Sequence, residues 1–203
     1  KININFLFLN DFLFNLKYSI FGSLCYLFYK LYSRLIFKPI DVIIDLFSTE
    51  TPDNYIFFPI QVSADSQLIN NSSFDNISAI KKILNDYPHK NILVKFHPAE
   101  RNYFFKMKLL FFLRKNKIKI SKSNTFNLIL NSKSVFTINS SVGLQAKICN
   151  KNVYFLGDSH FNNFTNKDIN TYINYYLLDI DFFSSNDISI SQLKSILRRA
   201  SMV

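Results

Sequence analysis

The chain has 203 residues, 48% of them hydrophobic, and a formal net charge of +10, which is enough for one folded domain with a real core plus a shorter extra segment. It has only three glycines and neither a G-x-G-x-x-G run nor a Walker A motif, so a glycine-rich phosphate cradle is excluded. Its two cysteines, Cys25 and Cys149, lie in apolar surroundings without motif spacing, which indicates buried free thiols and gives no sign of a disulfide or a metal site.

The amino-terminal stretch, residues 2–37, is the most apolar part of the chain. The longest charge-free run in its second half, residues 18–29, is about a dozen residues long, whereas a bilayer span needs about 20. We therefore expect a long helix from about Asp11 to Phe37 that packs on a partner domain. A helix lying on a membrane surface is the alternative, with Lys17, Lys30 and Arg34 at the lipid headgroups.

The domain boundary is expected near residue 48. Pro39 to Pro52 is interpreted as a connector with a weak apolar patch at residues 42–44. We expect residues 1–48 to be an apolar helix and connector, and residues 49–203 to form one domain. Because the chain begins with Lys1 instead of Met, we also expect it to be a fragment of a longer protein or a processed piece.

From Tyr55 onward, short apolar runs alternate with amphipathic runs. The apolar runs predict strands at Tyr55–Ile60, Ile92–Phe96, Lys117–Ile120, Val135–Asn139 and Val153–Leu156. The amphipathic runs predict helices at Asp75–Asp86, Arg101–Lys115, Thr125–Asn131, Val142–Cys149, Lys167–Leu177 and Ser191–Arg199, and Gln61–Ser73 is interpreted as a polar loop. This alternation favours an α/β fold: a Rossmann-like parallel sheet of about five strands with helices on both faces, preceded by the long apolar helix.

Candidate binding residues follow the second predicted strand. His97 precedes Pro98, which ends the strand because proline lacks an N–H and restricts the residue before it. Lys95 and His97 are two residues apart, so they point to the same face if the strand geometry continues. Ligands bind at the carboxyl ends of such strands. Lys95, His97 and Pro98 are therefore candidates for holding a phosphate.

A second candidate group follows the fourth predicted strand. Asn139, Ser140, Ser141 and Gly143 form a turn into the next helix. A serine cap leaves N–H groups of the helix amino terminus available to a phosphate, although a simple capped turn explains the same residues.

Other polar residues lie at the same expected edge. Gln61, Asp65 and Ser66 follow the first strand and are interpreted as a polar turn, as contacts to an acceptor or sugar, or, for Asp65, as a base. Glu100 is expected to cap the next helix or to bind hydroxyls. Gly157 and Asp158 predict a tight turn with a positive φ at the glycine, with Asp158 a minor site candidate.

Positive charge is concentrated between Lys95 and Lys122, where nine Lys and Arg residues stand against the single acidic residue Glu100. Two interpretations explain this cluster of positive charge equally well: a solvated helix face, or a surface that attracts an anionic ligand or an anionic membrane. Nucleic acid is not expected as a partner, because the aromatic residues here lie in apolar runs typical of a core and not of a stacking platform.

Four segments resemble one family. F-F-P-I-Q-V-S-A-D-S-Q, V-K-F-H-P-A-E, T-I-N-S-S-V-G-L-Q-A and V-Y-F-L-G, between about Tyr55 and Phe164, are similar to the bacterial capsule polysaccharide synthesis family, which includes retaining β-Kdo transferases. The four motifs in this order and spacing are fairly specific. The His-Pro and Ser-Ser pairs are also similar to the motifs with which bacterial sialyltransferases hold CMP-sugars.

The resemblance implies the donor-binding half of a GT-B glycosyltransferase of capsule biosynthesis that takes a Kdo-like sugar from a CMP-sugar, with no cofactor. By that analogy His97, Ser140 and Ser141 contact the CMP phosphate, and Lys95 adds charge. Gln61, Asp65 and Ser66 face the cleft between the two domains. The family usually has Glu where this chain has Gln145, so a ribose contact is in doubt there.

The resemblance also implies partners and a location. The acceptor is a glycolipid or polysaccharide, and the protein works in the cytoplasm at the inner-membrane surface, with capsule assembly proteins. The catalytic carboxylate belongs to the other half, and Asp65 and Glu100 are the weak candidates within this chain. The alternatives are a noncatalytic membrane-associated scaffold of a capsule assembly or export complex, and a transferase that uses a UDP-sugar.

Overall fold

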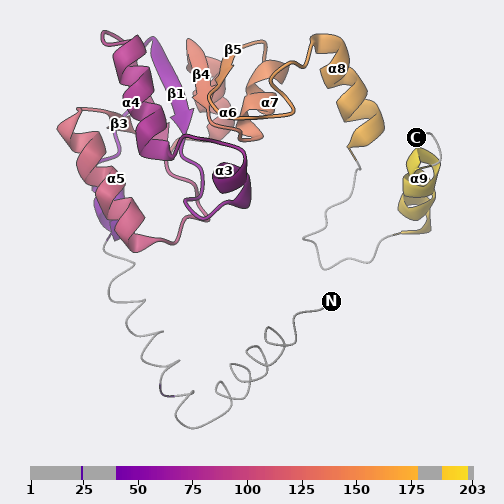
Figure 1. Ribbon diagram of the computed structural model, residues 1–203, viewed down its shortest axis with the longest axis horizontal. Helices are drawn as coiled ribbons and strands as arrows, with labels where there is room; N and C mark the ends of the chain where they lie inside the picture. The colour runs from indigo at the N-terminus through magenta and orange to yellow at the C-terminus, as the bar shows by residue number, and fades with distance from the viewer. Residues whose placement is uncertain (1–23, 25–39, 178–188, 201–203) are drawn as a thin grey trace.

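A five-stranded parallel sheet is the centre of the computed structural model, which describes residues 24, 40–177 and 189–200 (Figure 1). The strands are β1 (Tyr55–Pro59), β2 (Asn91–Lys95), β3 (Lys119–Ile120), β4 (Ser134–Thr137) and β5 (Asn152–Phe155), in the order β3-β2-β1-β4-β5. The predicted Rossmann-like α/β sheet is therefore confirmed. The order reverses between β1 and β4, which is the position where open parallel sheets bind ligands.

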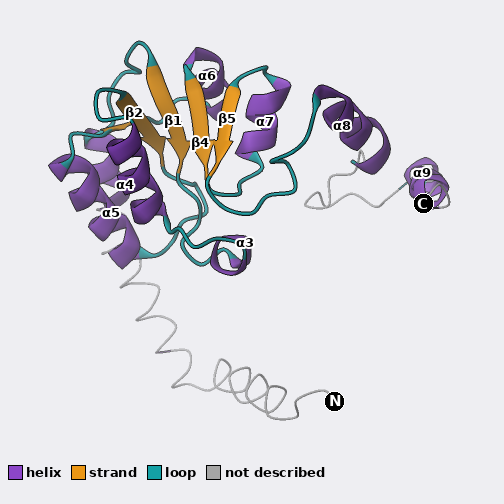
Figure 2. Ribbon diagram, turned by 45° about the horizontal axis from the view of Figure 1, so that its top comes forward, coloured by secondary structure: helices purple, strands orange, loops and turns teal. Residues whose placement is uncertain are grey.

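Helices cover both faces of the sheet (Figure 2). They are α3 (Ser66–Asn70), α4 (Asn76–Asp86), α5 (Tyr103–Lys115), α6 (Thr125–Asn131), α7 (Val142–Ile148), α8 (Asn166–Thr171) with a π-helical turn at Tyr172–Tyr176, and α9 (Ile190–Ala200). Asp75, Asn102 and Asn124 cap α4, α5 and α6 with their side chains. These caps explain why the predicted helices begin within two residues of their observed starts.

Two cores result from the alternation of side chains along the central strand. Ile56 and Phe58 of β1 point into the core that α4 and α5 cover, which also contains Ile80 and Leu109. The neighbouring residues Tyr55 and Phe57 point into the opposite core, formed with Leu128 of α6 and Ala146 of α7. Because both faces are buried, β1 is apolar throughout, as central strands of parallel sheets are.

Two predicted irregular segments contain helices. Within Gln61–Ser73, residues 66–70 form α3, with Asp65 as its cap and Leu68 as its only buried residue. Within the predicted connector, residues 40–46 are helical, and Ile40 and Ile44 belong to the core under α4 and α5. Both helices are short and bury one or two side chains each, so their hydrophobic pattern in the sequence is weak.

The long amino-terminal helix predicted from Asp11 to Phe37 lies outside the described residues, apart from Leu24, which is helical. Within the described part of the chain, none of the helices combines the length and apolar character that crossing a membrane requires.

Candidate functional site

A cleft of about 440 Å³ opens at the carboxyl ends of β1, β2 and β4. Five residues proposed from the sequence line it together: Lys95, His97, Pro98, Ser140 and Ser141. The register explains the convergence, because Pro59 of β1 pairs with Lys95 of β2 and the backbone N–H of Ile60 donates to the Lys95 carbonyl at 2.9 Å. Strands that end side by side bring the loops after them to one place.

Lys95 is the fixed positive charge of this cleft. Its half-buried ammonium group donates to the Ser123 carbonyl at 2.8 Å and to the Thr125 hydroxyl at 3.0 Å. Neither partner is charged, and none of the described residues lining the cleft is Asp or Glu. Burial lowers the pKa of Lys95 below its ordinary value, because desolvation disfavours the ammonium form. An anion in the cleft would supply the missing negative charge.

His97 is exposed and has one ring nitrogen engaged. Its Nδ1 accepts a hydrogen bond from the backbone N–H of Ala99 at 3.1 Å, so the neutral ring carries its proton on Nε2. The same turn is closed by the N–H of Glu100, which donates to the His97 carbonyl at 3.0 Å. The backbone after Pro98 thus fixes the tautomer of His97 and leaves Nε2–H as a donor.

The two serines before α7 differ in their hydrogen bonds. Ser140 accepts the N–H of Val142 at 3.2 Å through its hydroxyl oxygen. Ser141 is the residue at the helix cap position, but its side chain makes no capping bond and the residue is exposed. The Ser141 hydroxyl therefore remains available to a ligand. Because α7 has only seven residues, the side chains matter more here than the helix dipole.

Gln61 and Asn139 lie at the same edge but bond to each other. The Gln61 amide nitrogen donates to the Asn139 side-chain oxygen at 2.8 Å, and the Asn139 backbone N–H donates to the Gln61 side-chain oxygen at 3.0 Å. The buried Asn76 side chain holds the Gln61 backbone by two further bonds, of 2.9 and 3.0 Å. Gln61 is only 5% exposed. The structure thus places these amides as links between loops, outside the lining of the cleft.

The two carboxylates proposed as weak catalytic candidates are also engaged. Asp65 caps α3 by accepting the N–H of Gln67 at 2.9 Å, and Ser66 is the exposed first residue of that helix. Glu100 is 2% exposed, and its two oxygens accept the N–H groups of Ser63 at 2.6 Å and Asn102 at 2.7 Å. Neither carboxylate lines the cleft.

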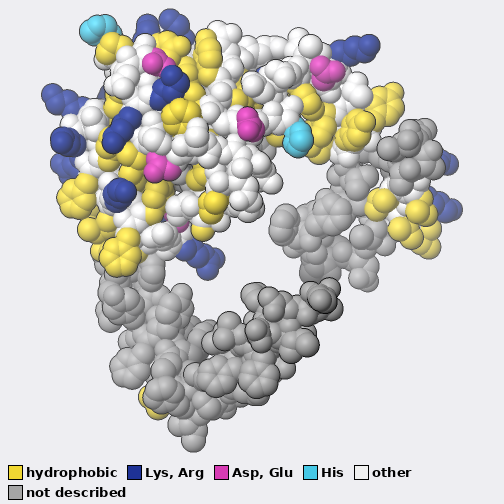
Figure 3. Space-filling model, in the orientation of Figure 1, with side chains coloured by type: hydrophobic (Ala, Val, Ile, Leu, Met, Phe, Trp, Pro, Cys, Tyr) yellow, Lys and Arg dark blue, Asp and Glu magenta, His cyan; other side chains and the backbone are white. Residues whose placement is uncertain are grey.

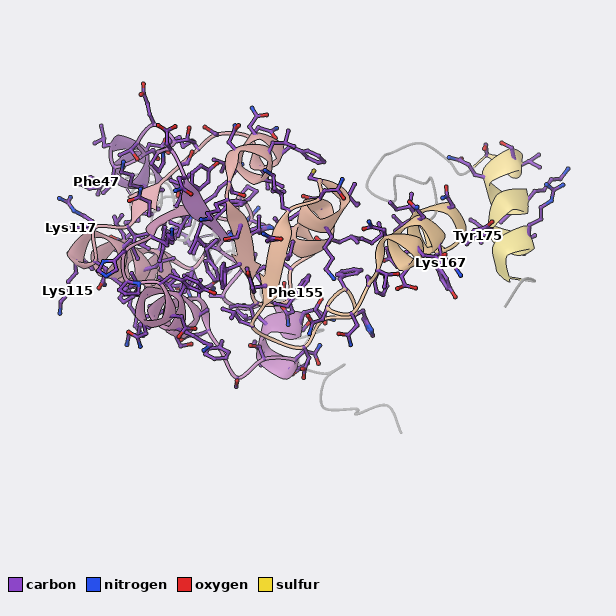
Figure 4. All side chains as sticks on the ribbon, turned by 90° about the horizontal axis from the view of Figure 1, so that it is seen from above. Phe47, Lys115, Lys117, Phe155, Lys167 and Tyr175 are labelled. Atoms are coloured by element: carbon purple, nitrogen blue, oxygen red, sulfur yellow. The ribbon has the colours of Figure 1, made fainter. Side chains whose placement is uncertain are left out.

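The two glycines proposed near the site are packing residues. A Cβ at Gly143 would lie 2.4 Å from the ring of Phe155, which Figure 4 labels, and 3.0 Å from Thr137 Cγ2. Gly157 does not have a positive φ, so the predicted strained turn is wrong. A Cβ at Gly157 would instead lie 2.9 Å from Ser72 and from Ile138. Close approach of neighbouring chain segments requires glycine at both positions.

The cleft contains residues that the sequence did not single out as ligands. They are Asn124, which caps α6, and Thr125 and Phe126, which begin it. The Thr125 hydroxyl accepts a hydrogen bond from the Lys95 ammonium group. The signal available for them was the polar run Ser123-Asn124-Thr125 at the start of that predicted helix, which is typical of a helix cap. Gln145, the residue that departs from the Glu usual in the resembling family, also lines the cleft and is half-buried on α7.

Most of the basic cluster lies away from the cleft. Figure 3 shows Lys and Arg side chains gathered over α4 and α5. In Figure 4, Lys115 and Lys117 lie at the left edge, whereas Phe155 lies near the middle of the picture. Lys106 and Lys122 pair with Asp41 and Asp45 at 2.7 and 2.6 Å. Of the nine basic residues from Lys95 to Lys122, only Lys95 lines the cleft.

Comparison with known proteins finds the same family that the motifs resemble. The family model described as "Capsule polysaccharide biosynthesis protein" matches residues 25–165. Protein FixF of Sinorhizobium fredii (strain NBRC 101917 / NGR234) is 31% identical over 120 residues, which are 53% of this chain and 27% of FixF. The chain therefore spans about a quarter of the length of that curated relative.

Two solved structures of Thermosulfurimonas dismutans KpsC are also similar. The beta Kdo 2,7 transferase aligns with a TM-score of 0.46 and 19% identity, over 75% of this chain and 46% of that one. The beta Kdo 2,4 transferase aligns with a TM-score of 0.43 and 16% identity, over 64% of this chain and 46% of that one. Since the family model covers well over half of the 203 residues, the chain belongs to the capsule polysaccharide biosynthesis protein family.

Proposed function

We propose that this chain is the donor-binding half of a capsule polysaccharide glycosyltransferase and that its cleft holds the phosphate of a CMP-sugar. The observation that carries the proposal is the convergence of Lys95, His97 and Ser141 in one cleft whose described lining has no acidic residue. Family membership supplies the setting of capsule polysaccharide synthesis. The resemblance of the His-Pro and Ser-Ser motifs supplies CMP-Kdo as the donor.

The chemistry of the three side chains suits a phosphate monoester or diester. Lys95 contributes an ammonium group without an anionic partner among the described residues of the cleft. His97 contributes Nε2–H, and Ser141 contributes a hydroxyl that is free of capping bonds. Hydrogen bonds to an ionised oxygen are shorter and stronger than neutral ones, so three such donors converging on one phosphate favour binding of the nucleotide.

We expect this chain to bind the nucleotide but not to transfer the sugar. Transfer requires a carboxylate positioned at the reacting carbon, but Asp65 caps a helix and Glu100 is buried between two backbone N–H groups. We therefore expect the isolated 203-residue chain to bind CMP and to transfer no Kdo to a glycolipid or polysaccharide acceptor. The catalytic carboxylate then comes from a facing domain, as in a two-domain transferase of the GT-B type.

The proposed setting follows from the proposed reaction. A lipid-linked acceptor places the protein in the cytoplasm at the inner-membrane surface, in contact with capsule assembly proteins. A noncatalytic scaffold of the same complex is the second candidate, favoured by the engagement of both candidate carboxylates. Use of a UDP-sugar is the third, because nothing among the described contacts of the cleft selects a base.

Calorimetric titration with CMP, UMP and UDP tests the proposal. We expect CMP to bind, UMP and UDP to bind more weakly, and His97→Ala to weaken CMP binding by about 1–3 kcal/mol, the range for a lost hydrogen bond to a charged group. The matched control is His89→Ala, because His89 is exposed and precedes β2 at the opposite edge of the sheet.

The outcomes separate the three candidates. Tighter binding of UDP than of CMP supports the UDP-sugar transferase. Absence of binding to all three nucleotides, or equal effects of the two histidine variants, overturns the nucleotide site and leaves the scaffold. Mass spectrometry of an acceptor incubated with CMP-Kdo and this chain then tests sugar transfer. Product formed by this chain alone would contradict the proposal that a facing domain supplies the catalytic carboxylate.

A further inference from the structure

The outer face of α5 carries two phenylalanine rings that the core does not bury. Phe104 is 81% exposed and Phe111 is 69% exposed, although both belong to a 13-residue helix whose other face is packed. Leu109 and Leu113 anchor that inner face and are fully buried. The apolar runs around the two rings are typical of a core, and for these two positions that expectation is wrong. Neither the packing of α5 nor the proposed nucleotide site accounts for them.

Two lysines alternate with these rings along one ridge of the helix. The residues follow one another at spacings of four, three and four, and we call them the α5 ridge: Phe104, Lys108, Phe111 and Lys115. Such spacings place side chains on the same side of an α-helix. All four residues are exposed, and at 1.5 Å per residue the ridge is about 16 Å long. Aromatic and cationic side chains therefore alternate over the length of the ridge.

The charge on and around the ridge is positive. Neither Lys108 nor Lys115 takes part in an ion pair within the described part of the chain, and the sequence of α5 contains no acidic residue. Lys108 interacts electrostatically with Asp75, the cap of α4. Lys117 and Lys119 add two exposed charges just beyond the end of α5. In Figure 3, hydrophobic and basic side chains lie side by side over α4 and α5. An anionic surface complements this face.

The mixture of rings and lysines fits the surface of an anionic bilayer better than a protein partner. The core of a protein–protein interface is depleted in lysine, but two of the four ridge positions are lysines. A helix that lies in a membrane interface places its aromatic rings at the boundary of headgroups and acyl chains, and its lysines beside the phosphates. The long lysine side chain keeps its ammonium group among the phosphates while neighbouring rings are buried.

We propose that the α5 ridge binds the surface of an anionic membrane. The two phenylalanine rings enter the interface, and the two lysines contact lipid phosphates. Seven peptide units separate His97 of the cleft from Phe104 of the ridge, and they span at most about 25 Å. A bound ridge therefore keeps His97 within about this distance of the headgroups. The membrane chemistry rests on the residues of α5, whereas its use for a lipid-linked acceptor rests on the proposed function.

A site-specific test is possible because the chain contains no tryptophan. The Phe111→Trp variant of the 203-residue chain carries a single indole on the ridge. We expect its emission to shift to shorter wavelength when vesicles of phosphatidylglycerol and phosphatidylcholine are added, and to be quenched by brominated acyl chains. The matched control is Leu130→Trp, because Leu130 is 51% exposed on α6, which covers the opposite face of the sheet. Its emission should not change.

Charge reversal tests the two lysines of the ridge. In the Phe111→Trp background, Lys108→Glu combined with Lys115→Glu should raise the lipid concentration at half-maximal shift by about tenfold or more, because both charges then repel the anionic lipid. Lys133→Glu combined with Lys167→Glu is the matched control, since it changes the net charge equally at two exposed lysines outside α5. That control should change the lipid concentration less than twofold. Circular dichroism checks that all variants are folded.

Each alternative outcome has a defined meaning. No shift for Phe111→Trp, an equal shift for Leu130→Trp, equal effects of the two charge reversals, or an equal shift with phosphatidylcholine alone overturns the proposal. Emission at short wavelength before vesicles are added would show that another segment or a second copy already covers the ridge, and would also overturn it. Lipid binding without CMP binding overturns only the proposed nucleotide site, and CMP binding without lipid binding overturns only the membrane surface.

Discussion

Gln61 and Asn139 bond to each other twice across the point where the strand order reverses, at 2.8 and 3.0 Å. One follows β1 and the other follows β4, so this amide pair joins the two loops between which the cleft opens, beside a cavity of about 760 Å³ at the carboxyl ends of β4 and β5. The side chain of Asn139 also donates to the Gln67 carbonyl at 2.7 Å, which connects the pair to α3. The geometry of the cleft and of the cavity beside it therefore depends on one buried glutamine.

The first prediction concerns this pair. Gln61→Ala leaves the Asn139 backbone N–H and its side-chain oxygen without their partners, and we expect the free energy of unfolding to fall by about 1–3 kcal/mol. Urea unfolding followed by circular dichroism measures the change. Gln67→Ala is the matched control, since Gln67 is exposed and its side chain accepts only from Asn71, and its effect should stay within about 0.5 kcal/mol. Equal effects of the two variants would contradict a bridging role for Gln61.

The second prediction separates a structural from a catalytic Glu100. Glu100→Gln places an amide N–H against one of two donors, the N–H groups of Ser63 and Asn102. We expect the free energy of unfolding to fall by about 1–3 kcal/mol, because a buried donor then lacks an acceptor. Urea unfolding of this variant beside Glu50→Gln, which alters an exposed glutamate, gives the comparison. Unchanged stability of Glu100→Gln would reopen a chemical role for this carboxylate.

The third prediction tests the packing of α7 on β5. Gly143→Ala brings a methyl carbon to 2.4 Å from the Phe155 ring, so we expect a loss of about 1–3 kcal/mol from overpacking. Phe155→Leu removes ring atoms from the contact. The double variant should therefore be more stable than the sum of the two single effects predicts. Thermal unfolding of the wild type, the two single variants and the double variant measures this coupling. Strictly additive effects would contradict a steric contact between the two residues.

The fourth prediction is a pH dependence. Burial lowers the pKa of Lys95, whereas a bound phosphate favours the ammonium form and raises that pKa again. Binding therefore takes up a proton above the lowered pKa. The CMP affinity should fall as the pH rises through the window between that pKa and the ordinary lysine value near 10.5.

Calorimetry across this window, in buffers of different ionisation enthalpy, measures both the affinity and the proton uptake. Lys95→Arg is the control, because the guanidinium group stays charged throughout, and its affinity should be nearly independent of pH there. The same slope in both proteins would show that another group titrates.

The sheet and the cleft could be predicted from the sequence because both depend on regular patterns. The strands were readable from apolar runs, and the meeting of Lys95 with Ser141 followed from the rule that parallel strands end at one edge. The boundaries of α4, α5 and α6 were predicted closely because Asp75, Asn102 and Asn124 cap these helices.

What the sequence did not reveal depends on contacts between loops. Gln61 and Asn139 were both interpreted as facing a ligand, but each satisfies the other across 78 positions. Gly157 was expected to adopt a positive φ, but it makes room for Ser72 instead. The cavity of about 760 Å³ at the carboxyl ends of β4 and β5 was missed because its walls come from α3 and from the loops after β4 and β5. The choice of partners among loop side chains is set by tertiary structure and leaves no periodic signal.

The central position of β1 also has a consequence for biosynthesis. Ile56 of β1 pairs with Ser134 of β4, which is translated long after β1. A ribosome needs about 4–16 s to translate the 78 positions between Gln61 and Asn139. During that time the Phe57 face of the strand lacks α6 and α7, which cover it in the folded domain. Closing a loop of this length costs conformational entropy before the stabilising contacts between β1 and β4 can form. We therefore expect the nascent chain to remain partly folded during this time, with one edge of β1 and its aromatic side chains accessible to chaperones.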